Sequence, residues 1–275
     1  MLNLSKYTNN LIEKDSIFFS EHNSEISYPE EENEDYYSLE DNSFWFSHRN
    51  NCIIETYIKN CTSTTFFDIG GGNGFVTRGF QNSGIETVLL EPGLKGCLNA
   101  KKRGIVNVIC STLENAGFEQ DSIPSLGVFD VVEHIENDLE FLKSLHLYLE
   151  KDGKLMLTVP SFNFLWSKDD VAAGHFRRYK LKEIENILKK AGFEITYSTY
   201  IFSVLPIPVF IFRTIPTLLG LNKNKNVFES HNKNHSKKSI FEKILNKIWA
   251  LELMRVKSGK RILFGGSCLV LAKKK

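Results

Sequence analysis

Between about residue 64 and residue 200, the chain alternates between short apolar runs, typical of strands, and stretches with helical spacing of apolar residues. Short apolar runs predict buried strands at 64–70, 86–92, 107–111, 122–130, 154–160 and 194–202. Helices are expected between them at 75–84, 96–104, 137–153 and 180–193, and helical spacing of apolar residues is clearest in the last two. Strands joined by helices predict an α/β fold, with a parallel sheet covered by helices on both faces.

The segments after this pattern are also rich in apolar residues. Residues 201–221 approach the length of a membrane span, but Arg213 and three prolines argue against a clean span. Two roles stay open for this segment: a helical roof over the site, or contact with a membrane surface. The Asn/Lys-rich stretch 222–238 is predicted to be a mobile loop. An amphipathic helix is expected at 239–256 and a closing strand at 261–275.

Composition narrows the classes of protein that this chain can belong to. A net charge of +1 gives no general attraction to nucleic acid, so no nucleic-acid partner is expected. Five cysteines without a Cys-x-x-Cys pair argue against a disulfide framework and a zinc ribbon. The first residues lack the pattern of a signal peptide. We therefore expect a cytoplasmic protein, with the inner face of the membrane as a second location if 201–221 contacts lipid.

The stretch FFDIGGGNGF, residues 66–75, follows the first predicted strand and holds four glycines. A phosphate-binding Walker loop needs Gly-Lys-Ser/Thr, which is missing here, and a dinucleotide fingerprint fails because Phe75 replaces its third glycine. The pattern that fits is acid-x-Gly-x-Gly-x-Gly, formed by Asp68, Gly70, Gly72 and Gly74. Glu91 ends the next strand about 20 residues later, where an acid can accept ribose hydroxyls.

These residues resemble motif I of the class I S-adenosylmethionine-dependent methyltransferases. The segments FDVVEHIEND, LEKDGKLMLTVPSF and GHFRRYKLKEIENILKKAGFEI are similar to later segments of a bacterial branch related to the ubiquinone-biosynthesis O-methyltransferases. The resemblance implies a Rossmann-like, doubly wound and mostly parallel sheet with an antiparallel C-terminal strand. We expect the chain to divide into a helical lead-in or cap (1–60), a cofactor-binding domain (61–200), an apolar helical insertion with a basic loop (201–260) and a closing strand (261–275).

The resemblance also implies S-adenosylmethionine as cofactor and assigns residues to its parts. Besides the glycine turn, the resemblance implies that Glu91 contacts the ribose of the cofactor and that Thr112 and Leu113 contact its adenine. It implies contacts of Phe129 and Asp130 with the ammonium and of Arg49 with the carboxylate. Ser111 and Thr112 replace the family's usual Gly-Asp, which puts the adenine contact in question. Simpler roles remain open: Asp68 as a brace of the turn, Glu91 as a solvated charge, Asp130 as a helix cap and Arg49 as an exposed helix residue.

Transfer of a methyl group to a hydroxyl benefits from a general base, and histidine suits neutral pH. His134 and His175 follow predicted strands and are the candidates, although each can instead be a structural residue. Substrate contacts are expected from Trp166, Arg177, Arg178 and Tyr179, with a core tryptophan and salt bridges to Asp169, Asp170 or Glu183 as the alternatives. The acid cluster of metal-dependent O-methyltransferases is missing, so no metal is expected.

The sequence thus predicts an S-adenosylmethionine-dependent methyltransferase, O-directed, acting on a small molecule, a sugar or a lipid-linked intermediate. Two alternatives remain, namely a non-catalytic binding or scaffold protein of the same fold and a nicotinamide-dependent oxidoreductase. The identity of the acceptor and the oligomeric state are left open, because acceptor pockets come from loops and insertions rather than from the shared fold.

Overall fold

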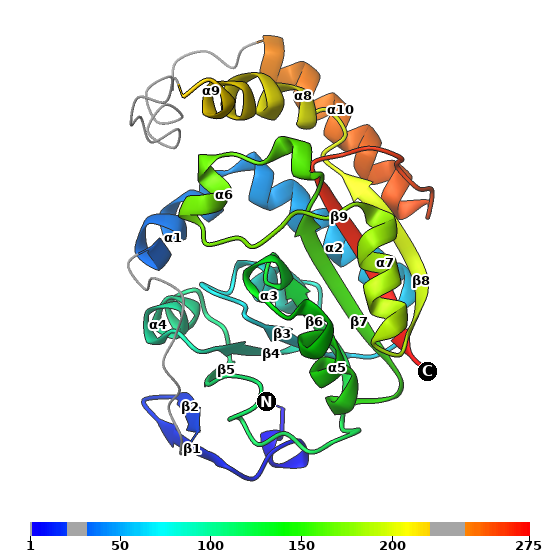
Figure 1. Ribbon diagram of the computed structural model, residues 1–275. Helices are drawn as coiled ribbons and strands as arrows, with labels where there is room; N and C mark the ends of the chain where they lie inside the picture. Colours follow the sequence, from blue (N-terminus) through cyan, green and yellow to red (C-terminus); the bar gives the residue numbers. More distant parts are fainter. Residues whose placement is uncertain (1, 21–31, 221–239) are drawn as a thin grey trace.

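A single sheet organises the chain, in a computed structural model that describes residues 2–20, 32–220 and 240–275. The described strands lie in the order β1-β2-β5-β4-β3-β6-β7-β9-β8 (Figure 1). Neighbours from β2 to β7 in this order are parallel, whereas the pairs β1–β2, β7–β9 and β9–β8 are antiparallel. The carboxyl ends of β5, β4, β3, β6 and β7 therefore meet at one edge of the sheet.

The elements follow the predicted pattern closely. The strands are β1 (Leu11–Lys14), β2 (Ile17–Ser20), β3 (Thr65–Ile69), β4 (Glu86–Glu91), β5 (Asn107–Cys110), β6 (Ile123–Phe129), β7 (Leu149–Pro160), β8 (Phe193–Ile201) and β9 (Ser267–Lys274). The α-helices are α1 (Glu32–Asn42), α2 (Phe44–Asn60), α3 (Phe75–Asn82), α4 (Leu94–Lys102), α5 (Asp138–Tyr148), α6 (Lys168–Ala172), α7 (Leu181–Lys190), α8 (Pro206–Val209), α9 (Ile215–Leu218) and α10 (Ile240–Lys257). Short 3₁₀ turns η1 (Leu4–Lys6), η2 (Val132–His134) and η3 (Asn163–Leu165) and the π-helix η4 (Phe210–Thr214) complete the described elements.

The helix predicted at 137–153 is shorter than expected, because its last residues belong to a strand. Helix α5 ends at Tyr148, and β7 starts at Leu149, which pairs with Ile123 of β6 and is fully buried. A leucine at helical spacing is equally suited to a sheet, so the pattern alone did not separate the two.

A β-hairpin near the N-terminus was not expected, since the lead-in 1–60 was predicted to be helical. Strands β1 and β2 are joined by Asp15 and Ser16, both with positive φ, and β2 pairs in parallel with β5. Ile17 is buried in a cluster beneath β4 and β5. The pairing with a strand some 90 residues away stabilises this short hairpin, which local sequence does not reveal.

The predicted closing strand is confirmed: β9 joins the sheet antiparallel, between β7 and β8. The apolar segment forms α8, η4 and α9 in direct succession, and Figure 1 shows them as a layer beyond α6, at the far end of the molecule from β1 and β2. In the described parts of the chain, each helix is too short or too polar to cross a bilayer. The predicted loop 222–238 lies outside the described residues.

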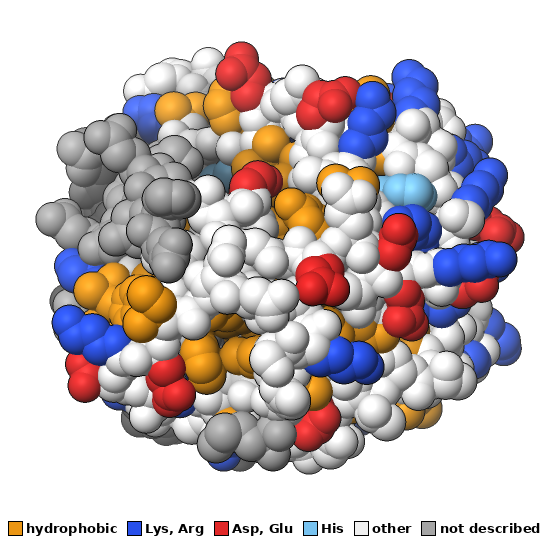
Figure 2. Space-filling model, turned by 90° about the horizontal axis from the view of Figure 1, so that it is seen from below, with side chains coloured by type: hydrophobic (Ala, Val, Ile, Leu, Met, Phe, Trp, Pro, Cys, Tyr) orange, Lys and Arg blue, Asp and Glu red, His pale blue; other side chains and the backbone are white. Residues whose placement is uncertain are grey.

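The helices pack on the sheet in two groups. Helix α2 contacts α3 and α10, while α5 contacts α7. On the face shown in Figure 2, acidic and basic side chains are interspersed and apolar side chains form small separate groups. This mixture agrees with the near-neutral net charge.

Candidate functional site

The glycine turn connects the end of β3 to the start of α3. Gly70 donates its N–H to the carbonyl of Leu90 in β4 at 2.8 Å, and Gly74 is the N-cap residue of α3, with a φ of +77°. A Cβ at Gly74 would lie 3.0 to 3.2 Å from side-chain atoms of Ile105, Ala100 and Leu89, and one at Gly70 would meet Val131 at 2.9 Å. Both positions therefore require glycine for conformation and for close packing.

Gly72 differs from its neighbours because it borders open space. Its φ is +51°, and a Cβ built there would meet no atom within 4 Å. Its N–H donates to one carboxylate oxygen of Glu91 at 2.9 Å, and the N–H of Gly93 donates to the other oxygen at 2.8 Å. Glu91 is largely buried, so it is a brace between the turn and the end of β4 rather than a solvated charge.

Asp68 lies beneath this turn and is almost completely buried. The hydroxyl of Thr77 in α3 donates to its carboxylate at 2.6 Å. Burial raises the pKa of Asp68 to about 6, and the hydrogen bond from Thr77 partly opposes that rise. This geometry agrees with the role of a brace, which ties β3 to α3 across the glycine turn.

Arg49 of α2 and Asp130, which follows β6, form an ion pair beside the turn. Asp130 also accepts a hydrogen bond from Thr158 at 2.9 Å, and its side chain does not cap η2, whose N-cap residue is Val131. Arg49 lies over the rings of Trp45 and Phe46, and burial lowers its pKa to about 10. Its Nε has no hydrogen-bond partner among the described residues. The pair places a cation and an anion together at the carboxyl end of β6.

A second arginine that the sequence analysis did not single out locks α1 onto the turn. Arg103 donates to Glu40 at 2.6 Å, to the carbonyl of Tyr37 at 2.9 Å and to the carbonyl of Asn73 at 3.3 Å. It also lies over the ring of Phe75. A basic residue at the end of a helix gives no local signal of such long-range contacts, so only the fold reveals it.

The residues predicted to contact adenine and ammonium lie at the ends of β5 and β6, which β4 and β3 separate in the sheet. Thr112 follows β5, and its hydroxyl accepts the N–H of Asn115 at 3.3 Å. Leu113 is buried in the main apolar core, and Phe129 ends β6 with its ring stacked on Phe66. Their roles toward a cofactor stay predictions.

The two candidate histidines meet at the same edge of the sheet. Their ring centroids are 4.7 Å apart in an edge-to-face arrangement. His175 Nδ1 lies 2.9 Å from Asp170 Oδ1, and the N–H of Phe176 donates to the carbonyl of Glu133 at 2.8 Å, which ties the loop after α6 to η2. Burial first, and then the neighbouring His175, lowers the pKa of His134 to about 4, so its imidazole is neutral at pH 7.

The predicted substrate-binding arginines each contact an acidic residue of the chain. Arg178 forms a two-pronged contact with Asp170 at 2.7 and 3.0 Å, and Arg177 contacts Asp138 at 2.9 Å. Tyr179 is buried and donates to Asp138 at 2.9 Å. Burial and the nearby carboxylate raise the pKa of Tyr179 above its usual value. Trp166 follows η3 and is half-buried. The substrate roles of these four residues stay predictions.

An open, largely parallel sheet with a glycine turn after β3 and an acid at the end of β4 defines the Rossmann-like class of α/β proteins. A family model described as a methyltransferase domain matches residues 47–198, more than half of the chain. The chain belongs to this family and is an S-adenosylmethionine-dependent methyltransferase, with S-adenosylmethionine as its cofactor. No curated protein sequence matches the chain.

Solved structures of methyltransferases share the fold over almost the whole chain. An S-adenosylmethionine-dependent methyltransferase from Thermotoga maritima, described as a possible histamine N-methyltransferase, has a TM-score of 0.56 and 14% identity, covering 90% of this chain and 100% of its own. One from Archaeoglobus fulgidus has a TM-score of 0.53 and 18% identity, covering 87% and 99%. The plantazolicin methyltransferase BamL, in complex with a triazolic desmethylPZN analog and SAH, has a TM-score of 0.53 and 16% identity, covering 90% and 92%. At these identities, the likeness establishes the fold.

Proposed function

We propose that this enzyme methylates an oxygen of an acceptor with a substantial apolar part, such as a small molecule or a lipid-linked intermediate. The observation that carries the proposal is the meeting of His134 and His175 at the carboxyl edge of the sheet. The neutral imidazole of His134 is suited to a hydroxyl acceptor, because a hydroxyl must lose its proton during methyl transfer, whereas a neutral amine attacks through its own lone pair.

The residues present fit the cofactor. The open space beside Gly72 is the place where a side chain would obstruct a close ligand, and it lies next to the carboxylate of Glu91. We assign the ribose hydroxyls to Glu91 and the amino-acid end of the cofactor to the Arg49–Asp130 pair, since a cation and an anion complement a carboxylate and an ammonium. The cofactor, when bound, supplies a methyl group on a positively charged sulfur. Adenine would contact Thr112 and Leu113.

On the acceptor side, the protein holds and orients the imidazoles. Asp170 fixes the ring of His175 through Nδ1 and is itself held by the fork of Arg178. Burial acts to raise the pKa of Asp170, but the hydrogen bonds with His175 and Arg178 outweigh it. The pKa of Asp170 is therefore low, at about 2, and this carboxylate is charged at neutral pH. Alignment of the acceptor oxygen and removal of its proton are then the two contributions of this part of the site.

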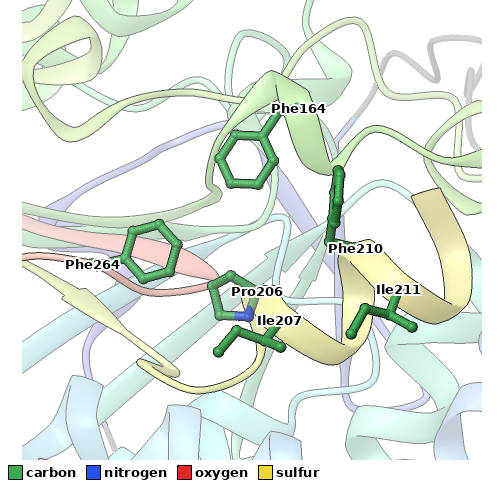
Figure 3. A pocket seen from close by; sticks show the side chains of 6 residues that line it. All are labelled: Phe164, Pro206, Ile207, Phe210, Ile211 and Phe264. Atoms are coloured by element: carbon green, nitrogen blue, oxygen red, sulfur yellow. The ribbon is translucent and has the colours of Figure 1, made fainter. Parts of the chain in front are cut away.

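An apolar cavity has a volume of about 210 Å³ and is lined by Phe164, Pro206, Ile207, Phe210, Ile211 and Phe264. Figure 3 shows the three phenylalanine rings and the side chains of α8 and η4 gathered around it. The layer that forms one wall is tied to α6 by the contact of Arg213 with Asp169 at 3.1 Å. We assign this cavity to the apolar part of the acceptor, which favours the roofing role of 201–221.

Contact with a membrane surface is proposed as an additional property of the same layer. Phe212 of η4 and Leu218 of α9 are three-quarters exposed. Exposed large apolar side chains gathered on one layer are typical of surfaces that meet lipid or apolar ligands. The inner face of the membrane is therefore the proposed second location of the enzyme.

Two experiments test this function. The protein is incubated with S-adenosylmethionine and a panel of phenols, sugars, amines and polyprenyl-linked sugars, and NMR locates the new methyl group in the product. Methylation of nitrogen or carbon only would refute the O-directed assignment, and binding of S-adenosylhomocysteine without any product would favour the scaffold alternative. Sedimentation with anionic liposomes tests membrane contact, and protein that stays in the supernatant would refute it.

A further inference from the structure

A carboxylate and two imidazoles converge outside the residues assigned to the cofactor. Ligand atoms of Glu133, His134 and His175 all lie within 4.8 Å of one another. Glu133 and His134 belong to η2 after β6, whereas His175 belongs to the loop after α6. The backbone hydrogen bond between Phe176 and Glu133 keeps the two segments in register.

Glu133 is buried, and no ion pair links it to a cation within the described parts of the chain. Glu133 is 1% exposed, and its Oε2 atom has no hydrogen-bond partner among the described residues. The nearby arginines have their own carboxylate partners, Arg49 with Asp130 and Arg178 with Asp170. A buried carboxylate in this condition is costly unless a cation accompanies it.

Each imidazole has one nitrogen committed to the protein, which is the arrangement typical of metal-ligating histidines. His175 uses Nδ1 for Asp170, so its Nε2 carries the lone pair. A ring nitrogen of His134 hydrogen-bonds with the backbone of Ala173. Both the carboxylate–histidine contact and the backbone contact fix ring orientation.

We propose that Glu133, His134 and His175 bind a divalent transition-metal cation such as Zn²⁺ or Mn²⁺. Two imidazoles and one carboxylate suit these ions. On a tetrahedral cation with bonds of about 2.1 Å, ligand atoms lie ~3.4 Å apart, so the side chains need to close by little more than about 1 Å. Three protein ligands leave an open position, as in catalytic metal sites.

This inference rests on the proposed function and specifies how the histidines serve it. The open position takes the acceptor hydroxyl, whose pKa falls on the cation. The proton leaves to solvent water, and the oxygen keeps the electron pair that forms the new bond to the methyl carbon. The bond from that carbon to the cofactor's sulfur breaks at the same time, its electron pair stays on sulfur, and S-adenosylhomocysteine is the leaving group. The imidazoles then act as ligands rather than as proton acceptors.

A second cluster, His48, Cys52 and Glu252, also has three potential ligands close together, but it provides a contrast. Its members are buried, and the carboxylate of Glu252 already accepts from His48 and from the backbone N–H groups of Phe202 and Ser203. This cluster joins α2 to α10 and the end of β8, and we assign it a structural role.

Metal-free protein titrated with Zn²⁺ in a calorimeter, and with Co²⁺ followed by its visible absorption, tests the site. We expect one cation per chain and a rise in Tm on adding Zn²⁺. Glu133→Gln, which keeps the shape of the side chain, and His134→Ala should each weaken Zn²⁺ binding at least tenfold and abolish the Tm rise. His146→Ala is the matched control, because His146 packs on Phe193 away from the cluster, and it should bind as the wild type does.

Three results would overturn the inference: no saturable binding to the wild type, binding unchanged in both Glu133→Gln and His134→Ala, or binding lost in Cys52→Ser instead. The titration needs neither cofactor nor acceptor, so it is independent of turnover. Methylation that persists in a chelator but is lost in the histidine variants would refute the metal site and retain the imidazole base. Cation binding with no O-methylated product would refute the proposed function and retain the metal site.

Discussion

Replacing Gly72 by alanine separates the ligand-binding role of the glycine turn from its structural role. Gly72 has a φ of +51°, and a Cβ there would meet no protein atom within 4 Å. Its N–H, which donates to Glu91, is retained in alanine. The only cost to folding is therefore the left-handed backbone, roughly 1 to 2 kcal/mol. In a chain of this size, this lowers Tm by about 2 to 8 °C.

Gly84→Ala is the matched control, because Gly84 has a φ of +80° and also has open space around its Cβ. It follows α3 and lies outside the turn, so it should show the same loss of stability without any change in ligand affinity. In Gly72→Ala, by contrast, the added methyl group occupies the edge of the proposed nucleoside site. An overlap of one methyl group costs about 1 to 3 kcal/mol, which corresponds to a loss of affinity of about fivefold to 150-fold.

Calorimetry with S-adenosylhomocysteine measures the affinity, and thermal unfolding measures the stability of the same samples. We expect both variants to unfold at similarly lowered temperatures and only Gly72→Ala to bind weakly. If Gly72→Ala bound S-adenosylhomocysteine as tightly as the wild type and Gly84→Ala do, the space beside Gly72 would not be the cofactor site.

Three further substitutions test the surrounding residues. Glu91→Gln keeps only one acceptor oxygen for the two backbone N–H groups that donate to Glu91, so it should lower the free energy of unfolding by about 1 to 3 kcal/mol. It should also weaken S-adenosylhomocysteine binding at least tenfold. Unchanged affinity in calorimetry would contradict the ribose assignment. The folded-state pKa of Asp68 is about 6 against an ordinary value of 3.8, so its ionisation lowers the free energy of unfolding by at most about 3 kcal/mol as pH rises from 4 to 6. Asp68→Asn should remove this fall, and urea unfolding at several pH values that gave parallel profiles for both proteins would refute it. Arg49→Met leaves the half-buried Asp130 without its cation and should cost about 1 to 3 kcal/mol, which Asp130→Asn in the same chain should partly restore in urea unfolding.

Local sequence was sufficient to predict the central part of the fold. Strands β3 to β6 and helices α3, α4 and α7 lie within a few residues of their predicted positions, because each has a clear apolar period bounded by glycine or proline. The glycine turn could be read directly, since positive φ at Gly70, Gly72 and Gly74 is a property of the residues themselves. The family match over 47–198 covers this same region.

Several contacts of the candidate site could not be read in this way. The sequence placed Arg49 and Asp130 near one ligand but gave no indication that they contact each other, since 81 positions separate them. It also gave no signal for the contacts of Arg103 with α1 or for the hairpin that pairs with β5.

The sequence by itself determined the class of fold, the glycine turn and the two histidines as candidates, because periodicity and backbone freedom are local properties. Only the tertiary structure decided that Asp68 and Glu91 brace the turn, that Arg177 and Arg178 have carboxylate partners within the chain, and that Glu133 joins the two histidines. The partners of a buried charge come from segments far apart in the chain. They are selected when the sheet brings its strand ends together and removes them from water, which no local pattern encodes.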